Sequence, residues 1–238
     1  MNQMEDIKKS CDLRHNNNTI SNINMQHNSS TVSNVNIDEK KSALRKRILD
    51  IRDSMPKSVV ESKSNIIINR LMSMEVWKKS NVIMSYVNFR NEVITTDFIN
   101  KSLLEGKRVA VPLVAKLSTR GKAIIPCEIK SLDNDLEISN FGILEPKQGS
   151  RREIEKKDID LIIVPGIAFD TNKNRLGFGA GFYDRFLLSI KEEYVKINSE
   201  ADYVTIGIAF EEQMVEAVPT EAYDIPLDII ITEKRVIL

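Results

Sequence analysis

The sequence predicts one α/β domain of three layers, in which helices cover both faces of a mostly parallel sheet. Two observations carry this prediction: short apolar runs rich in β-branched residues recur from residue 82 onward, and segments with helical spacing separate them. Strands that are apolar at every position are buried on both faces, as in parallel sheets. A length of 238 residues with 42% hydrophobic and 29% charged residues suits one globular core.

The first 36 residues differ from the rest of the chain. They hold nine Asn and five Ser but few large apolar side chains. Such a segment buries too little surface to offset the entropy lost on ordering, so we expect a disordered tail over residues 1–36. The folded domain is then expected over residues 37–238.

Two helices are expected to open the domain. Asp38 can cap the first, which ends before Pro56 and whose apolar positions have helical spacing: Leu44, Ile48, Ile51 and Met55. Its opposite face is basic, and spacing alone favours a solvated face over a ligand-binding one. The second helix is expected over about residues 58–73.

Strands and helices alternate after this point. Helices are expected over 95–106 and from 182 to about 191. Strands are expected over 82–87, 108–114, 123–129, 160–166, 203–210 and 227–232.

Composition excludes several classes of protein. Lys plus Arg equals Asp plus Glu at 34 each, so no overall positive field attracts nucleic acid or an anionic membrane. Cys11 and Cys127 form no metal or disulfide motif, and no apolar run approaches the roughly 20 residues of a membrane-spanning helix. We expect a cytoplasmic monomer that binds small molecules.

The segment RLGFGAGFYDRFL, residues 175–187, is the strongest candidate for a binding site. It follows an apolar strand and precedes a helix, which is where ligands bind in α/β sheets. Glycines 177, 179 and 181 allow positive φ, so that backbone N–H groups and the positive end of the following helix face an anion such as phosphate.

Two interpretations of the glycines stay open at this level. Their spacing matches neither the dinucleotide fingerprint nor the Walker pattern, and a loop that merely packs tightly is the alternative. The neighbours favour a phosphate site: Arg175 can neutralise charge, Phe182 and Tyr183 offer ring faces, and Asp184 can hold Mg²⁺.

The segment VPGIAFDTNKNRLGFGAGFYDRFL resembles the 5-formyltetrahydrofolate cyclo-ligase family, also called 5,10-methenyltetrahydrofolate synthetases. Four other segments are similar to motifs of the same family: KSALRKRIL (41–49), SYVNFRNEVITT (85–96), FGILEP (141–146) and AVPTEAYDIPLDIIIT (217–232). The resemblance covers about residues 38–238. It implies a fold of the sugar-phosphate isomerase and CoA-transferase type.

The resemblance also implies an activity and its site. The activity is ATP- and Mg²⁺-dependent closure of 5-formyltetrahydrofolate to 5,10-methenyltetrahydrofolate through a phosphorylated imidate, with Arg175, Tyr183 and Asp184 as catalytic residues. ATP would contact Lys41, Ser42, Ala43, Leu44 and Arg45, together with Arg175, Leu176, Gly177, Phe178, Gly179, Ala180, Gly181, Phe182 and Tyr183. The folate would contact Phe89 and Glu92 as well as Phe178, Gly179, Ala180, Gly181 and Phe182, and the metal would be held by Asp184 and Asp224, with Asp228 as an alternative acid.

Three positions depart from the family pattern. Ala180 stands where members usually carry Gly or Lys, Ile94 replaces an acid, and Phe182 replaces the commoner Tyr. Because Ile94 has no carboxylate, Glu92 is the acid of this segment that is left to contact the folate. Two other functions stay open: a binding or regulatory module that retains the nucleotide loop, and a sugar-phosphate isomerase-like enzyme that needs no ATP.

Overall fold

The computed structural model describes residues 30–238 apart from 118–120, 140–141 and 197–202. Its main sheet contains β1 (Val82–Ser85), β2 (Arg108–Leu117), β3 (Gly121–Ile129), β6 (Arg152–Glu153), β7 (Leu161–Val164), β10 (Val204–Ile208), β11 (Ile229–Ile231) and β12 (Val236–Ile237). The strand order is β12-β11-β10-β7-β1-β2-β3-β6. The five strands from β11 to β2 are parallel, and the outer three are antiparallel to their neighbours.

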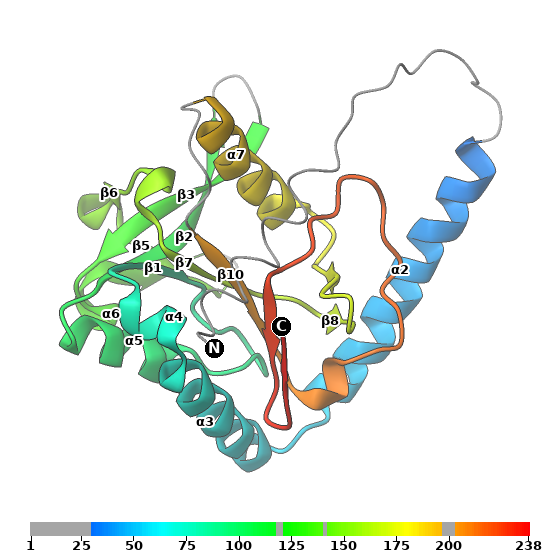
Figure 1. Cartoon of the computed structure of the whole chain (residues 1–238), viewed down its shortest axis with the longest axis horizontal. Coiled ribbons are helices and arrows are strands. Elements are labelled where there is room, and N and C mark those ends of the chain that lie inside the picture. The colour runs from blue at the N-terminus through cyan, green and yellow to red at the C-terminus, as the bar shows by residue number, and fades with distance from the viewer. Residues whose placement is uncertain (1–29, 118–120, 140–141, 197–202) are drawn as a thin grey trace.

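Helices cover both faces of this sheet, as expected (Figure 1). One face packs against α3 (Lys57–Ser73), α4 (Glu75–Lys79) and α5 (Thr96–Leu104), and the other packs against α7 (Phe182–Lys196). Side chains alternate between the two cores along β1, where Ile83 joins the first and Met84 the second. Both are fully buried, which explains why β1 is apolar throughout.

The strand over 123–129 was expected in a mostly parallel sheet, but it is antiparallel to β2. Only residues 118–120 separate β2 from β3. A connection this short cannot return the chain to the starting edge of the sheet, so the two strands form a hairpin.

The first helix, α2 (Ser30–Asp53), begins earlier than expected. The predicted cap at Asp38 is wrong, since Asp38 lies inside the helix, and residues 30–36 of the predicted tail are helical. The segment 30–53 contains no Gly or Pro, and its Asn, Thr and Val each cost at most about 0.7 kcal/mol in a helix. Residues 1–29 lie outside the described residues.

Several small elements had no clear sequence signal. They are α6 (Leu132–Asp135), the hairpins β4 (Leu136–Ile138) with β5 (Leu144–Pro146) and β8 (Ala168–Phe169) with β9 (Arg175–Leu176), and the 3₁₀ turns η1 (Gln148–Ser150), η2 (Lys156–Asp158) and η3 (Glu211–Gln213). No helix among the described residues is long and apolar enough to cross a bilayer.

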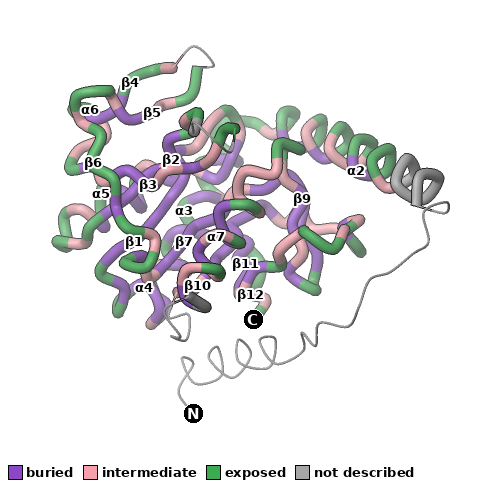
Figure 2. The backbone as a smooth tube through the Cα atoms, turned by 90° about the horizontal axis from the view of Figure 1, so that it is seen from above, coloured by how far each residue is buried: buried purple, intermediate pink, exposed green. Residues whose placement is uncertain are grey.

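The β8–β9 hairpin fixes the start of the glycine segment. Asp170 is buried in its turn, where Oδ1 accepts hydrogen bonds from the backbone N–H groups of Asn172 at 2.9 Å and Asn174 at 3.0 Å. Its Oδ2 accepts another from the backbone N–H of Val218 at 2.9 Å. The hairpin also packs against α2 through Ile48, so the basic helix and the glycine segment share one small core. Figure 2 shows β9 beside α2.

Candidate functional site

A cavity of about 810 Å³ lies at the carboxyl end of the parallel strands. Tyr86 directly follows β1 and Pro165 directly follows β7, and both line the cavity. Its walls also include one face of α2, the segment 175–185 and the loop 86–92. A ligand position at the strand ends agrees with the position expected for an α/β sheet.

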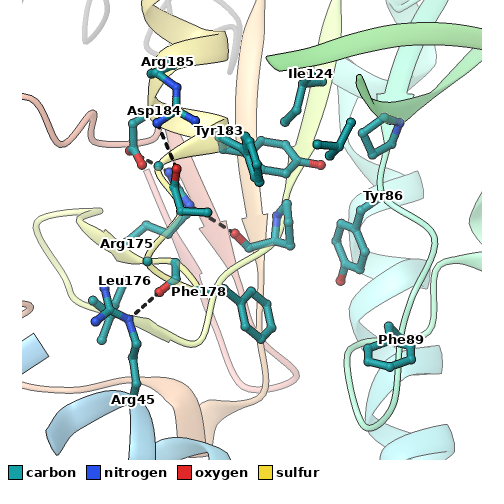
Figure 3. Close-up of a pocket in the computed structure, with 18 of the residues that line it drawn as sticks. Arg45, Tyr86, Phe89, Ile124, Arg175, Leu176, Phe178, Tyr183, Asp184 and Arg185 are labelled. Carbon is teal, nitrogen blue, oxygen red and sulfur yellow. Dashed lines mark hydrogen bonds and ion pairs between the residues drawn. The ribbon is translucent and has the colours of Figure 1, made fainter. Parts of the chain in front are cut away.

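The glycine segment forms one wall of the cavity. Gly179 and Gly181 have φ of +99° and +63°, but Gly177 does not have positive φ, so the expectation of three left-handed glycines holds for only two. The carbonyl of Gly177 instead accepts a hydrogen bond from Nε of Arg45 at 2.8 Å. This bond ties the glycine segment to α2, as Figure 3 shows.

Only part of the predicted α2 motif reaches the cavity. Lys41 and Arg45 line it, whereas Ser42, Ala43 and Leu44 do not. Residues four apart share a helix face, so a helix that presents Lys41 also presents Arg45 and turns the three residues between them away. Leu44 packs against the core beneath the β8–β9 hairpin.

Lys41 is buried and holds two acids. Its Nζ lies 2.7 Å from both Glu221 Oε2 and Asp224 Oδ2. Burial acts to lower the pKa of Lys41, but the bonds to these acids outweigh it and the net pKa is raised. Lys41 therefore presents a fixed positive charge between two carboxylates at the cavity wall.

Arg175 and Asp184 form a second ion pair in the cavity. Nη2 of Arg175 lies 2.7 Å from Oδ1 of Asp184, and the Arg175 side chain is only 4% exposed. Its guanidinium also lies over the Tyr183 ring, 5.9 Å from the centroid, and its Nε has no hydrogen-bond partner among the described residues. The predicted phosphate ligand and the predicted metal ligand are thus paired with each other.

The acids have separate locations. Asp184 and Asp224 both line the cavity, and the backbone N–H of Ile225 lies 3.5 Å from Asp184 Oδ1. Asp228, the alternative acid, does not line the cavity. It accepts hydrogen bonds from Thr205 at the start of β10, at the amino end of the strands.

The donor set suits a divalent cation only together with a ligand that brings oxygens. The described residues contain no group of three or more acid, His or Cys side chains that could hold a metal ion. Mg²⁺ in nucleotide sites is typically held by one or two carboxylates plus phosphate oxygens and waters. Oδ2 of Asp184 and Oδ1 of Asp224 accept no hydrogen bond from the described residues, so each has an oxygen available for such an ion.

The far end of the cavity is more apolar. Phe89 and Glu92 line it. Figure 3 shows Phe89 and Tyr86 across the cavity from Phe178 of the glycine segment. Glu92 is 9% exposed and its Oε2 accepts a hydrogen bond from the Phe89 backbone N–H at 3.0 Å. Burial raises the pKa of Glu92, with the Phe89 bond and the Arg52 charge acting against it.

Two tyrosines close this end. Tyr86 donates a hydrogen bond from its hydroxyl to the Val93 carbonyl at 3.2 Å, whereas the buried hydroxyl of Tyr183 has no partner among the described residues. Burial raises the pKa of both hydroxyls, so both are neutral donors. An unpaired buried donor on a cavity wall is available to a ligand acceptor.

The remaining predicted residues also lie on this wall. Leu176, Phe178, Ala180 and Phe182 line the cavity, and Phe178 is 58% exposed. The Ala180 carbonyl accepts a hydrogen bond from Nη1 of Arg185 at 2.8 Å.

Sequence reasoning missed Tyr86, Glu221 and Tyr223 as cavity residues. Tyr86 was assigned to a strand, although its position directly after an apolar run is a signal for a strand-end site. Glu221 and Tyr223 lie in the segment 217–232, where sequence reasoning singled out only the aspartates, and their contacts with Lys41 place them at the cavity.

Comparisons with known proteins give a consistent answer. A model described as the 5-formyltetrahydrofolate cyclo-ligase family matches residues 37–233. A Schizosaccharomyces pombe protein named "Probable 5-formyltetrahydrofolate cyclo-ligase" is 30% identical over 184 residues, which cover 75% of this chain and 88% of that protein. A Haemophilus influenzae 5-formyltetrahydrofolate cyclo-ligase is 26% identical over 185 residues, covering 77% of this chain and 92% of that protein.

A solved structure agrees in fold and sequence. The NMR structure of Aquifex aeolicus 5,10-methenyltetrahydrofolate synthetase superposes with a TM-score of 0.67 at 32% identity, covering 82% of this chain and 91% of that one. The family match extends over most of the chain and includes α2 from residue 37 onward, the glycine segment and the Asp224 loop. The chain therefore belongs to the 5-formyltetrahydrofolate cyclo-ligase family of enzymes.

Proposed function

We propose that this enzyme converts 5-formyltetrahydrofolate and ATP to 5,10-methenyltetrahydrofolate, ADP and phosphate, with Mg²⁺ as the metal. One observation carries the proposal beyond family membership. A single cavity is lined at once by the cations Lys41, Arg45 and Arg175 and by the aromatic end that contains Phe89. Such a cavity accommodates a polyanion beside a flat, partly apolar ring system.

The end of the cavity that contains Arg45 and Arg175 suits the phosphates of ATP. Arg45 and Arg175 come from distant parts of the chain and meet at the glycine segment, where Gly179 and Gly181 permit the backbone to approach a ligand closely. The start of α7 directly follows Gly181, so the partial positive charge of the helix adds to these cations. Phosphoryl transfer depends mainly on positioning and charge neutralisation, which this set supplies.

The proposed reaction proceeds in two stages. A formamide oxygen is a poor leaving group, so the formyl oxygen first attacks the γ-phosphorus of ATP, and the bond from that phosphorus to ADP breaks. The N10 lone pair of the folate then attacks the formyl carbon and closes a five-membered ring. The carbon–oxygen bond breaks, phosphate carries the oxygen away, and the N10 proton passes to solvent.

The residues of this chain contribute by position. Arg175 stabilises the charge that develops on the transferred phosphoryl group, and the neutral hydroxyl of Tyr183 donates to a substrate oxygen. Glu92 accepts hydrogen bonds from folate N–H groups. Phe89 and Phe182 pack against the rings of the folate. No nucleophile on the protein is required.

Asp184 and Asp224 would hold Mg²⁺, which in such sites neutralises phosphate charge. Both carboxylates are also ion-paired, with Arg175 and Lys41 respectively. The phosphate oxygens of ATP compete with the two carboxylates for Arg175 and Lys41. Binding of ATP therefore favours release of Asp184 and Asp224 from their ion pairs, which leaves them available to the metal.

One assay tests the proposal. ADP formation is measured with ATP and 5-formyltetrahydrofolate, with each substrate omitted in turn, and with Mg²⁺ replaced by a chelator. The methenyl product is followed in parallel by its absorbance. We expect equal amounts of ADP and methenyl product, and neither after chelation.

The other outcomes are informative. ATP binding without folate-dependent ADP formation would instead identify a binding or regulatory module. Turnover of a sugar phosphate without ATP would identify an isomerase-like enzyme.

A further inference from the structure

Arg52 is a buried arginine behind the aromatic end of the cavity. It lies near the end of α2, is 3% exposed and does not line the cavity. Its Nε and Nη1 have no hydrogen-bond partner among the described residues. Burying a guanidinium in this way costs several kcal/mol unless a partner compensates.

The partner is Glu92. Nη1 of Arg52 lies 3.8 Å from Oε1 of Glu92, and both side chains are largely buried, at 3% and 11% exposure. The local backbone reinforces the pair, because Nδ2 of Asn91 donates to the Arg52 carbonyl at 3.1 Å and so fixes the loop of Glu92 to the end of α2. The two oxygens of Glu92 are thus divided, with Oε2 on the Phe89 backbone and Oε1 facing Arg52.

The pair contributes little to stability by itself. Replacement of a buried ion pair by apolar side chains of similar size is often neutral or stabilising, because desolvation offsets the attraction between the charges. A separation of 3.8 Å without a hydrogen bond makes the attraction weaker still. The arrangement is better explained by what it does to Glu92, which lines the cavity.

We propose that Arg52 is a positioning residue for the folate substrate: its buried guanidinium, which faces Oε1 of Glu92, holds that carboxylate in place at the cavity wall. This inference rests on the proposed function for the identity of the ligand. An ionised Glu92 accepts hydrogen bonds from folate N–H groups with both carboxylate oxygens. A protonated Glu92 would carry an O–H donor on one oxygen, and that oxygen would no longer match a folate N–H group.

Arg52 is the charged side chain that acts on the pKa of Glu92. The titratable groups that face Glu92 are Arg52 from α2, Tyr86 from the loop after β1 and Tyr183 from α7. Burial raises the pKa of both tyrosines, so both are neutral near pH 7. Burial raises the pKa of Glu92 itself, and Arg52 is the side chain that counteracts this.

The first test follows the Glu92 carboxyl directly by carbon-13 NMR of protein labelled at glutamate, with the Glu92 signal assigned by its loss in Glu92→Gln. We expect Arg52→Met to raise the pKa of Glu92 by about one unit or more. A shift of one unit requires the loss of only about 1.4 kcal/mol of interaction between the Glu92 carboxylate and the Arg52 charge. Arg52→Lys retains the positive charge, so the pKa of Glu92 in this variant should lie between its values in the unmodified protein and in Arg52→Met. Arg47→Met, an exposed arginine on the same helix that does not line the cavity, is the matched control and should change nothing.

The second test separates positioning from a general loss of structure. Arg52→Met should raise KM for 5-formyltetrahydrofolate about tenfold at pH 7, while KM for ATP changes less than twofold. In Glu92→Gln, the further change Arg52→Met should have no additional effect on the folate KM, because the group that Arg52 acts on is already gone.

These measurements distinguish the inference from the proposed function. An unchanged Glu92 titration in Arg52→Met, or equal increases in both KM values, would overturn the role of Arg52. If the unmodified enzyme forms no ADP with the folate, the proposed function fails, and the NMR titration still decides whether Arg52 acts on the Glu92 carboxylate. Arg52→Lys provides the same comparison if Arg52→Met does not fold.

Discussion

Arg175 and Asp184 contact each other at 2.7 Å at the cavity wall, although the three glycines of the glycine segment separate them in the sequence. The hairpin before the glycines supplies the guanidinium, and the first turn of α7 supplies the carboxylate. The pair holds the two ends of the segment together. It also couples the group proposed for phosphate to the group proposed for the metal, so that a change in either affects both.

Arg175→Ala is expected to reduce folate-dependent ADP formation at least about 100-fold, the scale seen when a donor to a developing oxyanion is removed. Asp184→Asn is expected to reduce it as well, and also to weaken the dependence on Mg²⁺ concentration. Both variants should remain folded by circular dichroism, because Arg175 and Asp184 line the cavity and belong to neither of the two large hydrophobic cores. Near-normal formation of the methenyl product in either variant would contradict the assignment.

Gly179→Ala is expected to raise KM for ATP and to lower the free energy of unfolding by about 1–3 kcal/mol, because φ is +99°. The added Cβ would also come into van der Waals contact with Arg45, 3.4 Å from its Cζ, on the side of the segment that faces the ligand. Urea unfolding and ATP titration measure the two effects. Gly106→Ala is the matched control, since Gly106 has φ of +79° with no atom near its Cβ and does not line the cavity. Gly106→Ala should lower the stability and leave KM for ATP unchanged. An equal rise in KM for ATP in both variants would refute the interpretation.

The bond between Lys41 and Glu221 predicts a pH dependence of stability. The hydrogen bond from Lys41 lowers the pKa of Glu221 below its ordinary value of about 4.5. A carboxylate whose pKa is lowered by folding stabilises the fold above its unfolded pKa and loses this contribution as pH falls through the folded pKa.

Unfolding of the unmodified protein and of Glu221→Gln should therefore be compared at several pH values. We expect the unmodified protein to be the more stable of the two above about pH 5, and the difference to shrink as the pH falls below 4.5. A difference that is constant from pH 7 to pH 3 would show that the interaction does not depend on the charge of Glu221.

The two tyrosine hydroxyls predict opposite effects on stability. Tyr183→Phe removes a buried hydroxyl that has no partner among the described residues, so stability should stay within about 0.5 kcal/mol or increase. Tyr86→Phe removes the donor to the Val93 carbonyl and should cost about 1 kcal/mol. Thermal unfolding without ligands gives both values.

Activity gives the complementary result. We expect Tyr183→Phe to lower kcat for ADP formation by roughly 10- to 100-fold despite its normal stability, as expected when a donor to the reacting group is removed. A stable Tyr183→Phe enzyme with unchanged kcat would show that the hydroxyl does not contact the substrate.

Much of the fold could be predicted because local patterns carry it. Runs such as VIMS and LIIV are apolar at every position and became β1 and β7, the central parallel strands. The small hairpins β4–β5 and β8–β9 were not predicted, because two- or three-residue strands have no periodicity. The early start of α2 was missed because a cap residue such as Asp38 marks a possible start and does not prevent an earlier one.

The sequence by itself determined the α/β class, the position of the glycine segment at a strand end, and the family, since all three depend on residues close together in the chain. Only the tertiary structure decided which side chains meet: that Lys41 holds Glu221 and Asp224, that Arg175 holds Asp184, and that Asp228 lies away from the cavity. Arg52 had no local signal at all. Its contact with Glu92 depends on how the end of α2 packs against the loop after β1, and residues 40 positions apart leave no pattern in a single sequence for such packing.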